Sequence, residues 1–262
     1  MRKEINWARE YLDWRPLSNT DKGIEARYQI AFLENLNIEN SRTMWRHGRQ
    51  VGVSEVIIVS SIYLLFIREV NYRWKRTSQI LNSNNFYIQD SWISEKIIKH
   101  TWIKEFSLNN IATNILILSA DRNNADGLFE RTLFEIHNSG LSDKIIANKN
   151  ELTITGPKGI IDFSYPLKKS IHTLSSHFVF IDGASNISAE DLDYFIEKPG
   201  FLAICGTPKI KNCYFTHLFD NYSGFKKYQV TTLENPNFSS QNRKDLYNEL
   251  GSELFSKDIL AR

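Results

Sequence analysis

The stretch Trp45–Glu55, WRHGRQVGVSE, and the apolar run Val56–Ile67, VIIVSSIYLLFI, decide the fold of this chain. A short extended segment ends at Trp45 and enters a loop that carries Gly48 and Gly52, and the loop opens into a predicted helix, Ser54–Val70. Glycines let a backbone approach an anion, and the first N–H groups of a helix bind it together with the positive end of the helix dipole. The stretch therefore has the layout of a phosphate-binding loop.

The loop departs from the usual signature, G-x-x-x-x-G-K-[ST], in which the lysine reaches the terminal phosphates and the hydroxyl contacts Mg²⁺. Ser54 occupies the hydroxyl position, but Val53 stands where the lysine is expected. His47 occupies the position of the first glycine, and Gly48 comes one residue later. Glycine-bearing turns between a strand and a helix also occur in α/β proteins that bind no phosphate, so this alternative stays open.

The apolar run after the loop has two interpretations. Val56–Val59 and Ile62 are β-branched and suit a strand. The run is too long for an ordinary strand and contains no turn residue, which favours a helix. Because it is apolar nearly all round, we expect a central helix that is covered on several sides. It is shorter than the roughly 20 residues that span a bilayer, and we expect no membrane association.

Composition is that of a globular protein with a substantial core. The chain has 262 residues, 42% hydrophobic and 13% aromatic, which predicts a single large domain. Its net charge of +2 favours neither nucleic acid nor membrane, so any such site must be local. Cys205 and Cys213 lack metal-site spacing and suit a reducing compartment, and the N-terminus lacks the pattern of a signal peptide. These features predict a cytosolic protein.

Elsewhere the chain alternates between buried strands and helices. Apolar runs at residues 115–118, 177–183 and 201–205 predict strands, and residues 124–137 and 188–197 predict helices between them. This alternation predicts an α/β fold with a mainly parallel sheet and helices on both faces. The remaining predicted elements are helices at 4–14 and 23–37, a hairpin around Gly156–Gly159, a strand at 227–232 and a closing helix at 241–262.

Residues 68–110 are the least regular part of the chain. Arg73, Lys75 and Arg76 interleave with the aromatic residues Tyr72 and Trp74. Such clusters can bind a DNA backbone, although they are also typical of a solvated helix end. We expect residues 86–106, FYIQDSWISEKIIKHTWIKEF, to form a helix packed on the main layer.

Taken in order, five motifs resemble the ATPase domain of the tailed-bacteriophage terminase large subunit. GRQVGVSE, Gly48–Glu55, resembles that family's phosphate loop, and FVFIDGAS, Phe178–Ser185, its strand ending in Asp-Glu. GTPKIKNCYFTHLF, Gly206–Phe219, resembles its coupling segment. ILILSADRNNADGLFERT, from Ile115, and LENPNF, from Leu233, resemble the strand and helix after the loop and the stretch that leads towards a nuclease domain.

The resemblance implies an ASCE-type P-loop NTPase fold over residues 1–262, with a helical lead-in at 1–40, a core at 41–232 that includes the irregular segment 68–110, and a closing helix at 233–262. It implies roles for specific residues with ATP and Mg²⁺. Asp182 would be catalytic and, with Ser54, hold Mg²⁺, and Gln29 would lie on the adenine side. The ATP-binding loop would comprise Gly48, Arg49, Gln50, Gly52, Val53 and Ser54, and the coupling segment would be Gly206, Thr207 and Pro208.

The implied function is ATP-driven translocation of double-stranded DNA into a viral capsid, in the cytoplasm of the host cell. The implied partners are the portal, the small terminase subunit and further copies of the chain in a ring. The chain stops where the family's linker to its nuclease domain begins, and we expect a domain or a gene limited to the ATPase part. A helicase-like ATPase shares the loop and strand signals but not the Asn235-Pro236 region.

Two departures from the family bear on catalysis. Val53 replaces the lysine, and Gly183 replaces the glutamate that orients the attacking water. Losing one charge-stabilising group typically lowers a rate roughly 10²–10³-fold, so we expect hydrolysis barely above background. Arg46, Arg49 or Glu55 are candidate substitutes, and restoring lysine and glutamate together should raise turnover. The alternative is a non-hydrolysing scaffold that binds nucleotide or DNA. In that case Asp182 only accepts hydrogen bonds at the end of a strand, and Thr207 is only part of a turn.

Overall fold

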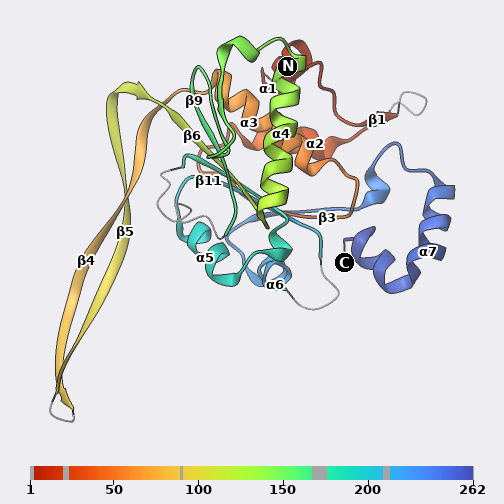
Figure 1. The fold of residues 1–262 in the computed structure, drawn as a ribbon. Coiled ribbons are helices and arrows are strands. Elements are labelled where there is room, and N and C mark those ends of the chain that lie inside the picture. The colour runs from red at the N-terminus through yellow and green to blue at the C-terminus, as the bar shows by residue number, and fades with distance from the viewer. Residues whose placement is uncertain (1–2, 20–23, 89–90, 167–175, 209–212, 262) are drawn as a thin grey trace.

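The computed structural model describes residues 3–19, 24–88, 91–166, 176–208 and 213–261. Its centre is an eight-stranded sheet with the order β12-β3-β11-β10-β6-β9-β8-β7, in which the first six strands are parallel and the last two antiparallel (Figure 1). The strands are β3 (Arg42–His47), β6 (Thr113–Ser119), β7 (Ile146–Asn148), β8 (Thr153–Thr155), β9 (Gly159–Ser164), β10 (Phe178–Asp182), β11 (Phe201–Gly206) and β12 (Lys226–Val230).

The central strands are buried on both faces, as a parallel sheet requires. Along β10, Phe178 and Phe180 pack into one apolar cluster, whereas Val179 and Ile181 pack into another on the opposite face. The first cluster joins the sheet to α1 (Lys3–Tyr11), α2 (Arg27–Asn35), α3 (Val53–Ile67) and α4 (Arg122–Asn138). The second joins it to α5 (Ala189–Glu197) and α6 (Tyr214–Asn221). The predicted α/β fold with helices on both faces is confirmed.

The apolar run after the loop is a helix, which settles the choice between helix and strand. In α3 every residue from Val56 to Leu65 is buried. Its two serines are satisfied within the helix, since Ser60 Oγ donates to the Val56 carbonyl and Ser61 Oγ to the Ile58 carbonyl. The helix is thus the central, covered element that its composition predicts. Among the described residues, no helix is long and apolar enough to cross a membrane.

The prediction of a helix at 86–106 is wrong. This region belongs to β4 (Val70–Ile88) and β5 (Ser91–Ile111), which pair antiparallel as a separate two-stranded sheet and extend away from the main sheet (Figure 1). The segment 68–110 is therefore regular. The apolar pairs in its second half recur every five residues, at 92–93, 97–98 and 102–103, and match neither a helical nor an alternating pattern.

The base of the β4–β5 hairpin is fixed to the main sheet by His177. The His177 Nδ1 atom accepts from the Asn114 backbone N–H at 2.9 Å, and Nε2 donates to the Tyr72 carbonyl at 2.7 Å. Burial lowers the pKa of His177, and both ring nitrogens are used in the neutral form. Tyr72 also contacts Lys104, whose ammonium lies 4.0 Å from the centre of its ring.

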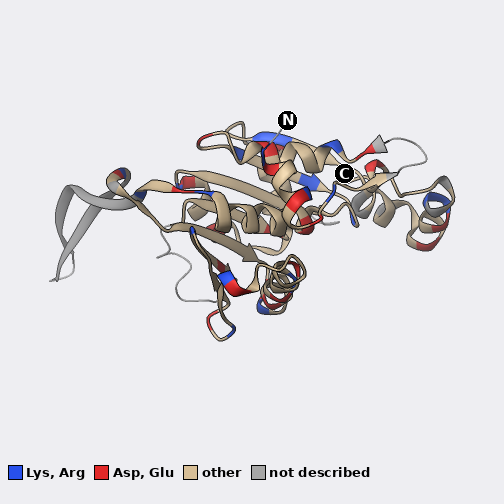
Figure 2. Ribbon diagram, turned by 90° about the horizontal axis from the view of Figure 1, so that it is seen from above, with Lys and Arg blue, Asp and Glu red and all other residues tan. Residues whose placement is uncertain are grey.

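The ends of the chain carry the smaller elements. Residues Ser18–Asn19 (β1) and Ile24–Glu25 (β2) form a short antiparallel pair. Short 3-10 turns are η2 (Ser142–Lys144), η3 (Ala184–Asn186) and η4 (Thr232–Glu234). The closing helix α7 (Ser240–Asp258) is interrupted at Gly251, where the backbone leaves the helical region. Lys, Arg, Asp and Glu are interspersed over the described elements, in keeping with the balanced charge (Figure 2).

Candidate nucleotide-binding site

The predicted loop lies at the carboxyl edge of the sheet, next to the acid of a neighbouring strand. Ser54, in the first turn of α3, donates from Oγ to Asp182 Oδ2 at 2.7 Å. Asp182 ends β10, and β11 separates β10 from β3, the strand that leads into the loop. Open α/β sheets bind ligands at this edge.

The backbone of the loop has the special conformations of an anion-binding turn. Gln50 and Gly52 have positive φ values of 58° and 70°. Gly52 precedes α3 without a side-chain cap, so the first N–H groups of the helix lack the partner that a cap provides. These donors are suited to an anion. The prediction that the loop binds phosphate through Gly48 to Ser54 has this geometry behind it, and the binding itself stays a prediction.

The Val53 side chain packs into the core of the protein. Its side chain is 3% exposed and belongs to the apolar cluster beneath the loop. Gly183, in place of the glutamate, has a left-handed backbone with φ 74° and ψ 35°. Both departures from the motif are therefore accommodated by the local structure.

Gln29 holds the loop rather than standing open to a base. Its Oε1 accepts from the Leu17 backbone N–H at 2.8 Å, and its Nε2 donates to the carbonyls of Val51 and Gly52, each at 3.3 Å. The side chain is buried, at 1% exposure. These contacts fix the loop, and the predicted contact between Gln29 and adenine remains untested.

Arg46 and His47 each have a protein partner, and a role for Arg46 as the substitute cation stays a prediction. Arg46 pairs with Asp220 at 2.8 Å, donates to Gln229 at 3.0 Å, and lies over the ring of Phe219. His47 donates from Nδ1 to the Gly48 carbonyl at 2.9 Å, and burial lowers its pKa, which keeps the ring neutral. Arg49 is exposed and stays a candidate.

The C-terminal segment holds the loop from the other side. Thr232 Oγ1 donates to the Arg49 carbonyl at 2.6 Å, and Asn235 Nδ2 donates to the Gln50 carbonyl at 2.8 Å. The Thr232 N–H in turn donates to the Ile259 carbonyl at 2.7 Å. The region around Asn235 therefore contacts the loop directly.

The predicted coupling segment also reaches this edge. Gly206 ends β11, and the carbonyl of Thr207 accepts a hydrogen bond from Ser185 Oγ, two residues after Gly183. Thr207 thereby connects the end of β11 with the turn that follows Asp182. Pro208 is buried at the end of the described stretch 176–208.

A cavity of about 290 Å³ opens beside Ser54 and Asp182. One face of α4 closes it, and Arg131 of that helix, a residue that the motif analysis missed, is the cation among its described lining residues. The spacing could have revealed it, since 124, 127, 128 and 131 share one helix face. The lining also includes Ser119, Ala120, Asn123, Asn124, Gly127, Leu128, Gly183 and Asn186.

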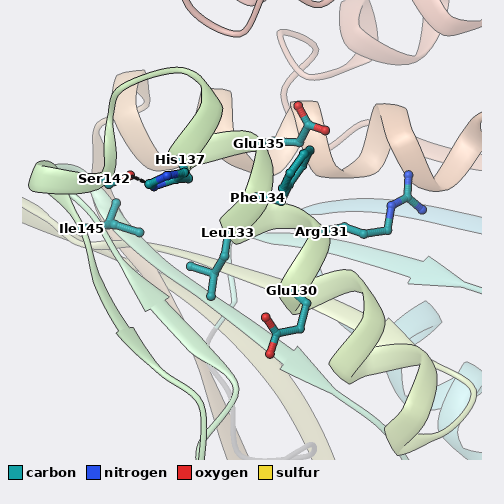
Figure 3. A pocket seen from close by; sticks show the side chains of 8 residues that line it. All are labelled: Glu130, Arg131, Leu133, Phe134, Glu135, His137, Ser142 and Ile145. Atoms are coloured by element: carbon teal, nitrogen blue, oxygen red, sulfur yellow. Dashed lines mark hydrogen bonds between the residues drawn. The ribbon is translucent and has the colours of Figure 1, made fainter.

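A larger hollow of about 870 Å³ lies along the far part of α4, where Leu133, Phe134, His137 and Ile145 gather, and Arg131 lines it as well (Figure 3). Of the predicted DNA-contacting residues, Arg73 is exposed and pairs with Glu105 at 2.8 Å. The side chains of Lys75 and Arg76 lie outside the described residues.

Within the described part of the chain, no group of three His, Cys, Asp or Glu residues could hold a metal ion.

The mainly parallel sheet with helices on both faces has the fold of terminase ATPase domains, which is of the P-loop NTPase type. Solved structures with this fold are the ATPase domain of the Thermus phage P74-26 large terminase, with a TM-score of 0.61 and 13% identity, and the large terminase of bacteriophage HK97, with 0.63 and 9%. The first match covers 97% of this chain and 96% of that one, and the second 100% and 55%. The resemblance predicted from the motifs is therefore confirmed for the fold.

A further match is the large terminase of a thermophilic bacteriophage, solved in complex with ATP-gamma-S, with a TM-score of 0.53 and 11% identity over 89% of this chain and 51% of that one. This chain thus spans nearly all of an isolated terminase ATPase domain and about half of the longer large terminases. Comparison with protein-family models and with curated proteins gives no match.

Proposed function

We propose that this chain is a nucleotide-binding domain of the large-terminase type, which binds ATP at the Ser54–Asp182 edge and hydrolyses it slowly. The observation that carries this proposal is the 2.7 Å hydrogen bond between those two side chains, beside a loop with uncapped helix N–H groups. The likeness to terminase ATPase domains, one of them solved with ATP-gamma-S, supports it.

The same two oxygens fit a magnesium ion. Mg²⁺ in phosphate sites prefers one or two protein oxygen ligands together with phosphate oxygens and water. Ser54 Oγ and Asp182 Oδ2 are such ligands, they lie within hydrogen-bonding distance of each other, and both are partly buried. When bound, Mg²⁺ would neutralise phosphate charge. Ser54 and Asp182 would hold it, and the loop amides would orient the phosphates.

Slow turnover follows from the residues that are present. Phosphoryl transfer in this class depends mostly on placement and charge stabilisation. The chain retains the loop and Asp182, which hold the nucleotide, but has an apolar side chain at position 53 and no side chain at 183. We therefore expect ATP binding to be better preserved than ATP hydrolysis.

The biological role in this proposal is viral DNA packaging, in the host cytoplasm. There the domain would act on double-stranded DNA as part of a ring on the portal, with the small terminase subunit. The second candidate is a scaffold of the same fold that binds nucleotide or DNA without hydrolysis. The apolar surroundings of Val53 favour this second candidate as regards mechanism.

Steady-state ATPase assays with DNA, combined with calorimetric binding of Mg-ATP-gamma-S, test the proposal. Binding with turnover just above background, lost in Asp182→Asn, supports the slow ATPase. Binding with no turnover above that of Asp182→Asn supports the scaffold. A chain that binds no nucleotide contradicts both. Brisk wild-type turnover that Arg49→Ala abolishes would instead make Arg49 the substitute cation.

A further inference from the structure

The cavity beside Asp182 has one wall that the phosphate-loop motif does not account for. Asn124, Gly127, Leu128 and Arg131 lie at spacings of three, four and seven residues on α4 and line it together. Ser54 and Asp182 line the same cavity. The guanidinium-bearing helix therefore shares one hollow with the residues proposed to hold the nucleotide.

A buried hydroxyl in the same cavity lacks a partner. Ser119, at the end of β6, is 1% exposed, and its Oγ has no hydrogen-bond partner among the described residues. Ser119 lies beside Asp182, because these two residues are register partners in the parallel pairing of β6 with β10. Buried hydroxyls are normally hydrogen-bonded, so this group indicates a polar ligand in the cavity, independently of Arg131.

Arg131 is held near the loop by a weak partner. Its Nη2 lies 3.3 Å from Glu55 Oε2, and the two side chains are 53% and 44% exposed. Exposed pairs of this kind contribute little to stability. Glu55 directly follows Ser54 on α3. Arg131 also lines the larger hollow on the far part of α4, but Figure 3 shows its side chain pointing away from Leu133 and Ile145 of that hollow.

We infer that Arg131 binds the terminal phosphate of a nucleoside triphosphate, in place of the lysine absent at position 53, and that Glu55 holds the guanidinium when that phosphate is absent. The inference rests on the proposed function. A phosphate carries more charge than a carboxylate and accepts a bidentate pair from arginine, so it competes well with Glu55 for the guanidinium. In this inference Ser119 Oγ is a second donor to the same group.

Calorimetric titration with Mg-ATP-gamma-S and with Mg-ADP distinguishes a contact to the terminal phosphate from a general effect. We expect Arg131→Ala to weaken ATP-gamma-S binding by at least about tenfold and ADP binding by less than about twofold. Arg131→Lys should retain part of the difference, and Glu55→Gln should tighten ATP-gamma-S a few-fold. The matched control is Arg122→Ala, an exposed arginine on the same helix that pairs with Asp126, which should change neither affinity.

The outcomes separate this inference from the proposed function. If the wild type binds both nucleotides and Arg131→Ala leaves both affinities unchanged, or weakens both equally, the inference is wrong and the proposed function stands. If the wild type binds neither nucleotide, both are wrong. Thermal melting of each variant checks that it is folded, and Arg131→Lys provides a second test should the alanine variant melt early.

Discussion

Ser54 Oγ and Asp182 Oδ2 lie 2.7 Å apart although 128 residues separate them in the sequence. The contact joins the first turn of α3 to the end of β10, which lies two places from β3, the strand that leads into the loop. It is short enough for a strong hydrogen bond to a charged acceptor. The two residues therefore fix the site at the edge where ligands bind in open α/β sheets.

Asp182→Asn should weaken Mg-ATP-gamma-S binding by at least about tenfold, because it removes the carboxylate charge while keeping an oxygen that can accept from Ser54. Binding measured across a series of magnesium concentrations checks this. Asp143→Asn, at an exposed position in η2, is the control and should bind as the wild type does. Unchanged magnesium dependence in Asp182→Asn would count against the assigned metal ligands.

The two changes that restore the family motif should behave differently. Val53→Lys places an ammonium where the wild-type side chain is 3% exposed in an apolar cluster, and we expect it to lower the free energy of unfolding by about 2–4 kcal/mol. At Gly183 the nearest atom to an added Cβ is the Ala120 Cβ at 3.8 Å, so there is room, and the left-handed backbone costs about 1–2 kcal/mol.

Turnover should therefore rise more in Gly183→Glu than in Val53→Lys. The double variant should exceed Gly183→Glu in turnover only if the first turn of α3 adjusts to let the lysine reach the phosphates. Urea unfolding and steady-state ATPase of the three variants check both parts. A stable Val53→Lys protein with raised turnover would show that the side chain at position 53 reaches the phosphates.

The sequence predicts the central strands of the sheet well because each of them has a strong local signal. The apolar runs ending at Ser119, Asp182 and Gly206 are buried on both faces, and such runs have few alternatives in a chain of this size. Ser188 also caps α5 at the start of the predicted helix, since its Oγ accepts from the Asp191 N–H at 3.1 Å. For these elements local pattern and tertiary position agree.

The β4–β5 hairpin and the long-range contacts of Gln29 and Arg131 could not be predicted in the same way. The β4–β5 hairpin lies outside the main sheet, so its sequence is not required to match the alternation of a strand that covers the core. Gln29 is tied to Val51 and Gly52, more than twenty residues away, and Arg131 pairs with Glu55 across 76 residues. Contacts of this kind arise only once α2, α3 and α4 pack on the sheet.

Gly48 should not tolerate a side chain. A Cβ there would lie 2.4 Å from Thr232 Oγ1 and 2.7 Å from the Ile259 carbonyl, so Gly48→Ala must displace the C-terminal segment from the loop. We expect a loss of about 2–3 kcal/mol in the free energy of unfolding. Gly127→Ala is the matched control: it meets nothing within 4 Å in α4 and should add about 0.5–1 kcal/mol. Equal effects of both variants in urea unfolding would contradict the described contact.

DNA binding by the cluster at the start of β4 predicts a salt effect. If Arg73, Lys75 and Arg76 contact phosphates, their joint replacement by alanine should reduce the slope of log affinity against log salt by up to about 3, because each contact contributes about 0.9. Fluorescence anisotropy with double-stranded DNA at several salt concentrations measures the slope. Lys144→Ala with Lys149→Ala, exposed lysines elsewhere, is the control. An unchanged slope in the triple variant would return the cluster to an ordinary solvated surface.

Lys198 is a buried cation close to the base of the hairpin. It is 2% exposed, its Nζ donates to Ser176 Oγ at 2.9 Å, and its carbonyl accepts from Arg42 Nη1 at 2.9 Å. Burial lowers the pKa of Lys198 from 10.5 to about 8. Because the unfolded chain holds the proton more tightly, the charged lysine opposes folding, and the shift corresponds to about 3 kcal/mol.

Lys198→Met should therefore be more stable than the wild type at pH 7, by about 1–3 kcal/mol once the lost hydrogen bond to Ser176 is allowed for. The wild-type penalty is fully present below pH 8, where the lysine is charged in both states. It declines as the pH rises from 8 towards 10.5, since the folded protein has then released the proton that the unfolded chain still holds. Urea unfolding at pH 7, 8.5 and 10 should show the difference between the two proteins shrinking. Lys226→Met, at an exposed lysine, should show no such trend. A difference that stays constant across this range would mean that the ammonium of Lys198 is stabilised in the folded protein.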